Sequence, residues 1–390
     1  MNLIHLGEPE IGSFYDDEEL EAIKNEFDIF SKGSTFKTKN EIKEKIKLFE
    51  DAFSSKFNVN YSVAVSSGAS ALDIILEYLS LNNNSEIIAP AIGFHGTYLS
   101  IIRSGAKLVL CDSDINLNVD TKSLEECISK NTLAVVITHM NGLPCDMDEI
   151  NKAIDKKERE FGTSIKLIGD AARSCGSLYK GRNLSDYEWA TYYSFQRKKQ
   201  ITTLGEGGMI TTKDKFLYDF LISFRSFGLG KELGGNFKIT PMQASVGIVQ
   251  LKKLNQLNNS RRTIAKRRTE YFTKHLKDFL LPLDNEDYFN TFYLYSLLVP
   301  EHWTELMRNE LILYMKKHYN IGCCIANDVV YKSNPYIARA LRNKKFPKSE
   351  KIGSRTLSII LHPMLDINQE KFINQAFVES VRKIEKRRSE

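Results

Sequence analysis

The chain has 390 residues, of which 42% are hydrophobic, so it is long and apolar enough to build a large core. Its formal charge of +5 is spread over 54 basic and 49 acidic residues, which gives no reason to expect a nucleic-acid-binding protein. No apolar run reaches membrane-spanning length, and the N-terminus lacks the basic segment and apolar core of a signal peptide, so we expect a cytoplasmic protein without membrane contact.

The six cysteines are scattered through apolar sequence and show no CxxC spacing. Closely spaced cysteines are typical of metal sites, and a dense set of cysteines is typical of disulfide-stapled secreted domains. We therefore expect buried thiols in a reducing compartment, with no disulfide bonds and no bound metal.

The first part of the chain predicts two helices, then a strand and a third helix. The helices cover Asp17–Phe30 and Asn40–Phe57, and the strand is Val63–Val65. The turn Ser66–Gly68 leads into the third helix. A glycine in the first turn of a helix, with serines beside it, presents free backbone N–H groups to an anion.

Strands and helices then alternate, as in a parallel sheet with helical crossovers. Strands are predicted at 87–88, 107–111 and 133–138. The next apolar run, 165–168, ends in Gly169-Asp170 and so delivers a carboxylate to the carboxyl edge of the sheet. Ligands bind at that edge in open α/β sheets.

Asp170 needs a cationic partner there, because an unpaired buried carboxylate is costly. The protonated ring nitrogen of pyridoxal 5'-phosphate (PLP) would serve, and an aspartate facing this nitrogen is a recurring arrangement. The alternative is that Asp170 only caps a helix that begins at Ala171.

Residues 194–208, SFQRKKQITTLGEGG, join two β-like runs at 189–195 and 209–212. They combine a serine, two adjacent lysines and a glycine-rich turn. A lysine at a strand end can form a covalent bond with a carbonyl carbon, because burial readily lowers the pKa of its amine. The alternative is a surface hairpin with solvated lysines.

These segments together resemble a known family. Asp170-Ala-Ala, Ser194-Phe-x-x-x-Lys199 and Gly205-Glu-Gly-Gly are similar, in this order, to the DAAQ, SFxxxK and GEGG motifs of the DegT/StrS family of PLP-dependent sugar aminotransferases. The resemblance implies an α/β fold of type I, like that of aspartate aminotransferase. A three-layer α/β/α large domain with N-terminal helices would cover 1–255, and a smaller α+β domain would cover 256–390.

The resemblance also implies the reaction. Lys199 would hold PLP as an internal aldimine, L-glutamate would donate its amino group, and a keto-sugar, nucleotide-linked, would accept it in amino-sugar and polysaccharide biosynthesis. Freed Lys199 would move the α-proton as a base of lowered pKa, and Asp170 would keep the ring nitrogen protonated. The family implies a homodimer with shared active sites.

Other site residues follow from the same resemblance. The cofactor phosphate would bind at Gly68, Ala69 and Ser194; Ala69 stands where the family has Thr, and Ser70 would replace the lost hydroxyl. Phe94 would stack on the pyridine ring, and Asn236 would reach the phosphate in the neighbouring subunit. Arg173 replaces a Gln that touches the ring hydroxyl in the family. The implied set is Gly68, Ala69, Ser70, Phe94, Asp170, Arg173, Ser194, Lys199 and Asn236.

Two neighbouring lysines compete for the covalent role. Successive residues of an extended segment face opposite ways, so only one can reach the cofactor. Parity with Ser194 would favour Lys198, whereas the family's spacing favours Lys199. We choose Lys199, because we expect a turn at Gln196–Lys198, where alternation fails. Another candidate base, His95, is expected to make only local hydrogen bonds.

Residues 234–244 predict a loop that leads into a helix ending near Leu254, and beyond residue 255 the pattern changes. A basic helix at 260–279 begins with SRRTIAKRR, which we expect to be a solvated face. A strand at 292–299, a helix at 303–318, a strand at 357–361 and a helix at 369–386 follow. Residues 321–336 depart from the family's His-Tyr-x-Pro-x-His pattern, so the resemblance says least about the acceptor pocket.

Three other functions remain as alternatives. PLP-dependent sugar dehydratases of the same family carry His in place of the lysine, so Lys199 opposes that function. A non-catalytic PLP-binding regulatory protein would not need both Lys199 and Asp170. A nicotinamide enzyme would have a GxGxxG motif after the first strand, and the sequence has none there.

Overall fold

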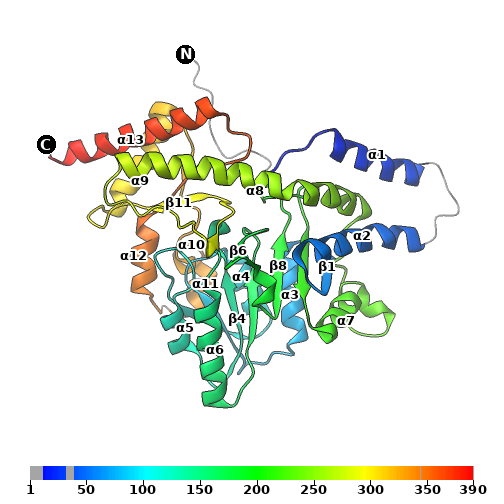
Figure 1. The fold of residues 1–390 in the computed structure, drawn as a ribbon. Helices are drawn as coiled ribbons and strands as arrows, with labels where there is room; N and C mark the ends of the chain where they lie inside the picture. Colours follow the sequence, from blue (N-terminus) through cyan, green and yellow to red (C-terminus); the bar gives the residue numbers. More distant parts are fainter. Residues whose placement is uncertain (1–11, 32–38, 343, 390) are drawn as a thin grey trace.

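The computed structural model describes residues 12–31, 39–342 and 344–389, and it has a mixed α/β fold around one central sheet (Figure 1). This sheet has seven strands in the order β1-β9-β8-β5-β4-β2-β3. Strand β9 pairs antiparallel with β1 and β8, and the other pairings in the sheet are parallel. The parallel-dominated sheet confirms the fold class predicted from the sequence.

The strands are short apolar runs close to the predicted ranges. Those of the central sheet are β1 (Tyr61–Val65), β2 (Glu86–Pro90), β3 (Lys107–Cys111), β4 (Thr132–Thr138), β5 (Lys166–Asp170), β8 (Ala190–Ser194) and β9 (Gly208–Thr212). A small sheet beside it is built from β6 (Leu178–Tyr179), β7 (Arg182–Asn183) and β10 (Tyr288–Phe289).

Helices cover both faces of the central sheet, because its hydrophobic side chains alternate between two cores. Val63 and Val65 belong to a core with α3 (Gly68–Tyr78), α4 (His95–Arg103) and α7 (Lys215–Phe224). Ala64, between them, faces the opposite core, which includes residues of α2 (Lys39–Phe57), α5 (Thr121–Cys127), α6 (Met147–Phe161) and α8 (Pro241–His275). The three layers follow from this period-two alternation. Helix α1 (Asp17–Ser31) packs on α8.

Helix α8 is one continuous helix, whereas the sequence had suggested a helix ending near Leu254 and a second beginning at Ser260. The intervening residues contain neither Gly nor Pro, so nothing interrupts the helix. The expected domain boundary at 255/256 therefore falls inside α8, and the division into domains stays a prediction. The packing does change along this helix: Leu257 belongs to a core of the central sheet, and Ile264 to a third core.

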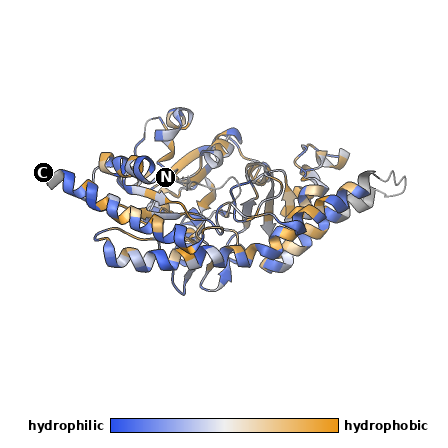
Figure 2. Ribbon diagram, turned by 90° about the horizontal axis from the view of Figure 1, so that it is seen from above, coloured by the Kyte–Doolittle hydropathy of each residue, from blue (hydrophilic) through white to orange (hydrophobic). Residues whose placement is uncertain are grey.

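This third core lies under a second small sheet. Its strands, β11 (Tyr295–Leu298), β13 (Thr356–Ile359) and β12 (Cys323–Cys324), pair antiparallel. The remaining helices are α9 (Glu305–Tyr319), α10 (Val330–Ser333), α11 (Pro335–Ala340), α12 (Pro347–Arg355) and α13 (Ile367–Ser389). In Figure 2, α13 alternates between hydrophilic and hydrophobic residues along its length, as expected for a helix with one buried side.

Two expectations about polar and sulfur-containing residues need correction. The basic run in α8 is not a solvated face throughout, because Arg261 and Arg268 are buried, with exposed fractions of 2% and 0%. All six cysteines are free thiols, but Cys127, Cys323 and Cys324 are only half-buried. In the part of the chain that the structure describes, no helix is long and apolar enough to cross a membrane.

Candidate active site

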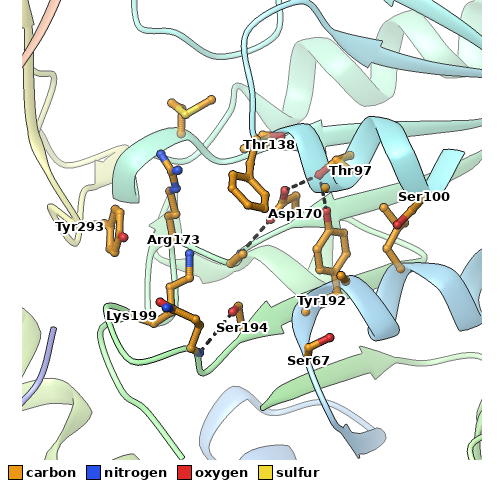
Figure 3. A pocket seen from close by; sticks show the side chains of 18 of the residues that line it. Ser67, Thr97, Ser100, Thr138, Asp170, Arg173, Tyr192, Ser194, Lys199 and Tyr293 are labelled. Atoms are coloured by element: carbon orange, nitrogen blue, oxygen red, sulfur yellow. Dashed lines mark hydrogen bonds between the residues drawn. The ribbon is translucent and has the colours of Figure 1, made fainter. Parts of the chain in front are cut away.

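The predicted site residues converge because parallel strands end at the same edge of the sheet. Gly68 follows β1, Phe94 follows β2, and Asp170 ends β5. Ser194 ends β8, and Lys199 lies in the turn beyond it. These residues line one cavity of about 450 Å³ (Figure 3). Ala69 and Arg173 also line this cavity, whereas Ser70 and Asn236 do not.

Asp170 is buried at the floor of the cavity, with an exposed fraction of 4%. The Thr97 hydroxyl donates to its Oδ2 at 3.2 Å, and the Ala172 N–H donates to its Oδ1 at 3.0 Å. No helix begins at Ala171, so the capping alternative is wrong. A buried carboxylate held by two neutral donors and facing a cavity is suited to a cationic ligand group.

Asp170 is also supported through Tyr192 on the neighbouring strand. The hydroxyls of Tyr192 and Thr97 lie 3.2 Å apart, and Figure 3 shows Thr97 in contact with both Asp170 and Tyr192. Burial, and then the charge of Asp170, raise the pKa of Tyr192 well above its usual value of 10.0. Tyr192 therefore stays a neutral hydrogen-bonding group beside the carboxylate.

The first turn of α3 forms a cradle at one end of the cavity. The first N–H groups of a helix have no partner within the helix. Here the N-cap residue Ser67 accepts the Ser70 N–H at 3.0 Å, and the amides of Gly68 and Ala69, which border the cavity, remain as donors for a ligand. A Cβ on Gly68 would lie 3.0 Å from the Cβ of Ser194, so a larger residue would push the two segments slightly apart. This cradle can bind an anion.

The hydroxyl of Ser70 makes hydrogen bonds within the turn. It lies 2.8 Å from the hydroxyl of Ser67 and 3.0 Å from that of Ser66. Ser70 thus braces the turn, while Gly68, Ala69 and Ser194 border the cavity.

The turn between β8 and β9 separates the two lysines. Residues 197 and 198 form a turn, and the Lys199 N–H donates to the Gln196 carbonyl at 2.8 Å. Lys199 lines the large cavity, whereas Lys198 lines a different, small one. The expected turn is confirmed, and it brings Lys199 into the same cavity as Asp170.

Glycine is needed in the Gly-Glu-Gly-Gly segment for two different structural reasons. Gly205 and Gly207 have φ values of +99° and +154°, which side chains disfavour. A Cβ on Gly208 would lie 2.5 Å from the backbone of Ser67. The segment therefore places the start of β9 directly against the anion cradle.

Arg173 lies on the opposite side of the cavity from this cradle. Its Nη1 donates to Asn141 Oδ1 at 2.9 Å and to Asn327 Oδ1. Its guanidinium carbon and the Lys199 Nζ lie 5.3 and 5.1 Å from the centroid of the same Tyr293 ring. Figure 3 shows the three side chains on one side of the cavity. Arg173 and Lys199 are therefore neighbours.

Phe94 and Asn236 are both exposed. Phe94 is 51% exposed at the start of α4 and lines the cavity, and the ring of its neighbour His95 lies against it, tilted by 40°, with ring centroids 4.1 Å apart. His95 does not border the cavity. Asn236 lies in the loop before α8, where it bridges to Ser226.

Reasoning from the sequence missed several residues that line the cavity. Tyr192 had a signal, since it lies two residues before Ser194 on the same strand and so faces the same side. Asn327 lies in the segment 321–336 that the resemblance connects with the acceptor pocket, but nothing singled it out there, and Tyr293 had no signal because only the fold brings it here. Across the described ranges, no cluster of His, Cys, Asp and Glu is arranged to hold a metal ion.

Known proteins resemble the chain over nearly its whole length. The DegT/DnrJ/EryC1/StrS aminotransferase family matches residues 22–377. The spore coat polysaccharide biosynthesis protein SpsC of Bacillus subtilis is 30% identical over 82% of this chain and 85% of its own. A dTDP-3-amino-3,6-dideoxy-alpha-D-galactopyranose transaminase of Aneurinibacillus thermoaerophilus is 30% identical over 84% of this chain and 88% of its own.

Solved structures share the fold. Spr1654 of Streptococcus pneumoniae, assigned as a sugar aminotransferase and solved in its PLP form, superposes with a TM-score of 0.86 at 22% identity, over 98% of this chain and 100% of its own. The chain therefore belongs to the DegT/DnrJ/EryC1/StrS aminotransferase family and is, as its motifs predicted, a PLP-dependent sugar aminotransferase.

Proposed function

We propose that the protein transfers an amino group from L-glutamate to a keto-sugar, nucleotide-linked, with PLP bound covalently to Lys199. The observation that carries this proposal is the position of Lys199 and Asp170 in one cavity with an anion cradle at its end. We also place the protein in the cytoplasm, where six free thiols stay reduced.

The residues present fit this cofactor. The amides of Gly68 and Ala69 and the hydroxyl of Ser194 offer donors for its phosphate, and Asp170 is a buried carboxylate whose hydrogen bonds to described residues include no cationic partner. Phe94 offers an exposed ring at the cavity wall. When bound, PLP supplies an aldehyde that takes up the amine and a ring that accepts electrons.

The chain's own residues then have distinct tasks. Asp170 holds a proton on the ring nitrogen by charge, and Thr97 and Ala172 keep its carboxylate oriented. The Nζ of Lys199 takes the proton from the α-carbon of the donor and returns a proton on the acceptor side. The same lysine opposes the dehydratase alternative, since those relatives carry His there.

Relatives support the acceptor class, because one of them is named for a nucleotide-linked amino sugar. The test is a screen of keto-sugar nucleotides with L-glutamate, followed by formation of 2-oxoglutarate. The proposal predicts that at least one nucleotide-linked keto-sugar is aminated. Turnover only with unlinked keto-sugars or cyclitols would contradict the nucleotide part of the proposal.

We further propose a homodimer with shared sites. Asn236 is exposed outside the cavity, and the adjoining loop exposes Phe227, Leu229 and Leu233, with exposed fractions of 58%, 59% and 84%. Exposed apolar groups of this kind favour an interface. Mixing Lys199→Ala and Asn236→Ala subunits should restore activity in hybrid dimers, and no restoration despite subunit exchange would place Asn236 in its own chain's site.

A further inference from the structure

Arg173 is held by neutral groups. Among the described residues its guanidinium bonds to two amide oxygens and to no carboxylate. The orientation of one amide is fixed, because Asn141 Nδ2 donates to the Ser296 hydroxyl at 2.8 Å and leaves Oδ1 for Arg173. Both amides bind Nη1, so the edge formed by Nε and Nη2 makes no hydrogen bond within the described chain.

The backbone of Arg173 is hydrogen-bonded to the turn between β8 and β9 that carries Lys199. Gln200, which is fully buried and follows Lys199, donates through Nε2 to the Arg173 carbonyl and to the Thr291 hydroxyl. Asn327, which lies between β12 and α10, adds another contact to the guanidinium. The backbone of this segment is joined to the end of β2 in the central sheet, because the Val330 N–H donates to the Ala91 carbonyl at 2.9 Å. The position of the guanidinium is therefore set from three directions.

The charge of Arg173 is special within the cavity. Of the described residues that line it, the cationic ones are Arg173 and Lys199. Under the proposed function Lys199 is engaged in covalent and proton-transfer chemistry. A donor amino acid brings an α-carboxylate that is separated by two bonds from its reacting nitrogen, so this carboxylate must bind close to Lys199.

We propose that Arg173 binds the α-carboxylate of the amino donor through its Nε/Nη2 edge. This inference rests on the proposed aminotransferase function. Guanidinium groups recognise carboxylates with two parallel hydrogen bonds, and that geometry needs a planar fork with one edge unengaged. It gives Arg173 a different task from the ring-oxygen contact that the family's Gln makes, and it holds for any α-amino acid donor.

The first test uses the wild-type holoenzyme. The half-reaction is measured with L-glutamate and with L-isoglutamine, which differs only in having an amide in place of the α-carboxylate. Because the α-carboxylate would accept a charge-assisted hydrogen bond, the second-order rate constant of the half-reaction should be roughly 10- to 100-fold higher for L-glutamate than for L-isoglutamine. Equal use of the two donors would overturn the inference without any variant.

The second test uses Arg173→Gln and Arg173→Lys. The glutamine variant should lose the preference for L-glutamate, and the lysine variant should keep part of it, since it retains the charge but not the fork. Calorimetric binding of L-2-hydroxyglutarate and its α-amide, which lack an amine and cannot react, should show the same loss of discrimination. A glutamine variant that still discriminates would refute the assignment.

Further comparisons distinguish carboxylate binding by Arg173 from a general effect of losing an arginine and from a contact with the ring oxygen. Arg182→Gln removes an arginine that also stacks on a tyrosine, 4.7 Å from the Tyr187 ring, but lies outside the cavity, so discrimination should be unchanged. If Arg173→Gln instead shifts the pH dependence of the bound-PLP spectrum and keeps discrimination, Arg173 faces the ring oxygen. A wild type that reacts with no amino acid would refute the proposed function itself, whereas equal reaction with both donors refutes only the role of Arg173.

Discussion

Asp170 illustrates how one residue depends on its neighbours. Its carboxylate accepts hydrogen bonds from Thr97 and Ala172, and the Tyr192 hydroxyl lies beside that of Thr97. These partners are neutral, so they orient the carboxylate without neutralising it. A cation that enters the cavity is therefore the group that compensates its charge.

The first prediction follows at this scale. Asp170→Asn should still bind PLP through Lys199, but a neutral amide cannot hold the proton on the ring nitrogen. An opposite charge shifts a neighbouring pKa by one to three units, at about 1.4 kcal/mol per unit. Stopped-flow measurement of the half-reaction with L-glutamate should show a loss of roughly 100-fold or more.

Thr97→Val is the matched control for this variant. It removes one hydrogen bond to the carboxylate and keeps its charge, so its loss of rate should be much smaller. Near-wild-type turnover of a folded Asp170→Asn protein would contradict the role assigned to Asp170.

At the scale of elements, the first two helices and several strands of the central sheet were predictable from the sequence. Strands β3 and β4 match the predicted ranges to within one residue, because most of their side chains are apolar and pack into the cores. Helix α8 was less predictable, because the packing changes from one core to another within a stretch, residues 255–259, that contains neither Gly nor Pro. The sequence could place Asp170 and Lys199 through motifs, but not Tyr293, which reaches the cavity only through tertiary packing.

Strand β5 also carries a close approach that the sequence did not indicate. A Cβ on Gly169 would lie 1.9 Å from Glu188 Oε2. That carboxylate is buried and lies 2.6 Å from His139 Nε2 and 2.5 Å from the Thr191 hydroxyl. Glycine next to Asp170 is thus required by packing.

We predict that Gly169→Ala lowers both stability and PLP affinity. Overpacking at a buried site costs roughly 1–3 kcal/mol, and the displaced Glu188 would disturb the strand that carries Asp170. Thermal unfolding and PLP titration measure the two effects. Gly105→Ala is the control: its Cβ meets nothing within 4 Å but its φ is +84°, so it should lower the melting temperature and leave PLP affinity unchanged. Equal PLP affinity in both variants would contradict the prediction.

At the scale of the whole molecule, α8 connects the core of the central sheet with the core under the sheet of β11, β12 and β13. Buried arginines lie where the two cores meet. Arg268 donates to the Ile360 carbonyl at 2.8 Å and to Asn374 Oδ1 at 2.8 Å. Burial lowers the pKa of Arg261 and of Arg268 to about 10. Both therefore remain charged at neutral pH, and this affects a nearby histidine.

His362 should make stability depend on pH. Burial, followed by the charges of Arg261 and Arg268, lowers its pKa from 6.5 to about 4. The unfolded chain therefore binds this proton at a higher pH than the folded chain does. The free energy of unfolding is thus expected to fall as the pH drops from 6.5 towards 4.

Melting temperatures of wild type and His362→Asn across this range test the effect. The variant should lose less stability with falling pH, because the proton-binding difference is gone. His275→Asn, which changes an exposed histidine at the end of α8, the helix that carries Arg261 and Arg268, should keep the wild-type slope. Parallel curves for wild type and His362→Asn would contradict this prediction.

The central claim is that Lys199, in the cavity of Asp170, performs amino transfer with PLP. The most direct measurement is a single-turnover reaction of the PLP-loaded protein with L-glutamate and no acceptor, followed by visible absorbance and by 2-oxoglutarate. Wild type and Lys198→Ala should lose the visible absorbance and form one 2-oxoglutarate per site, whereas Lys199→Ala should do neither. An unchanged spectrum in the wild type, or an active Lys199→Ala with an inactive Lys198→Ala, would contradict the account.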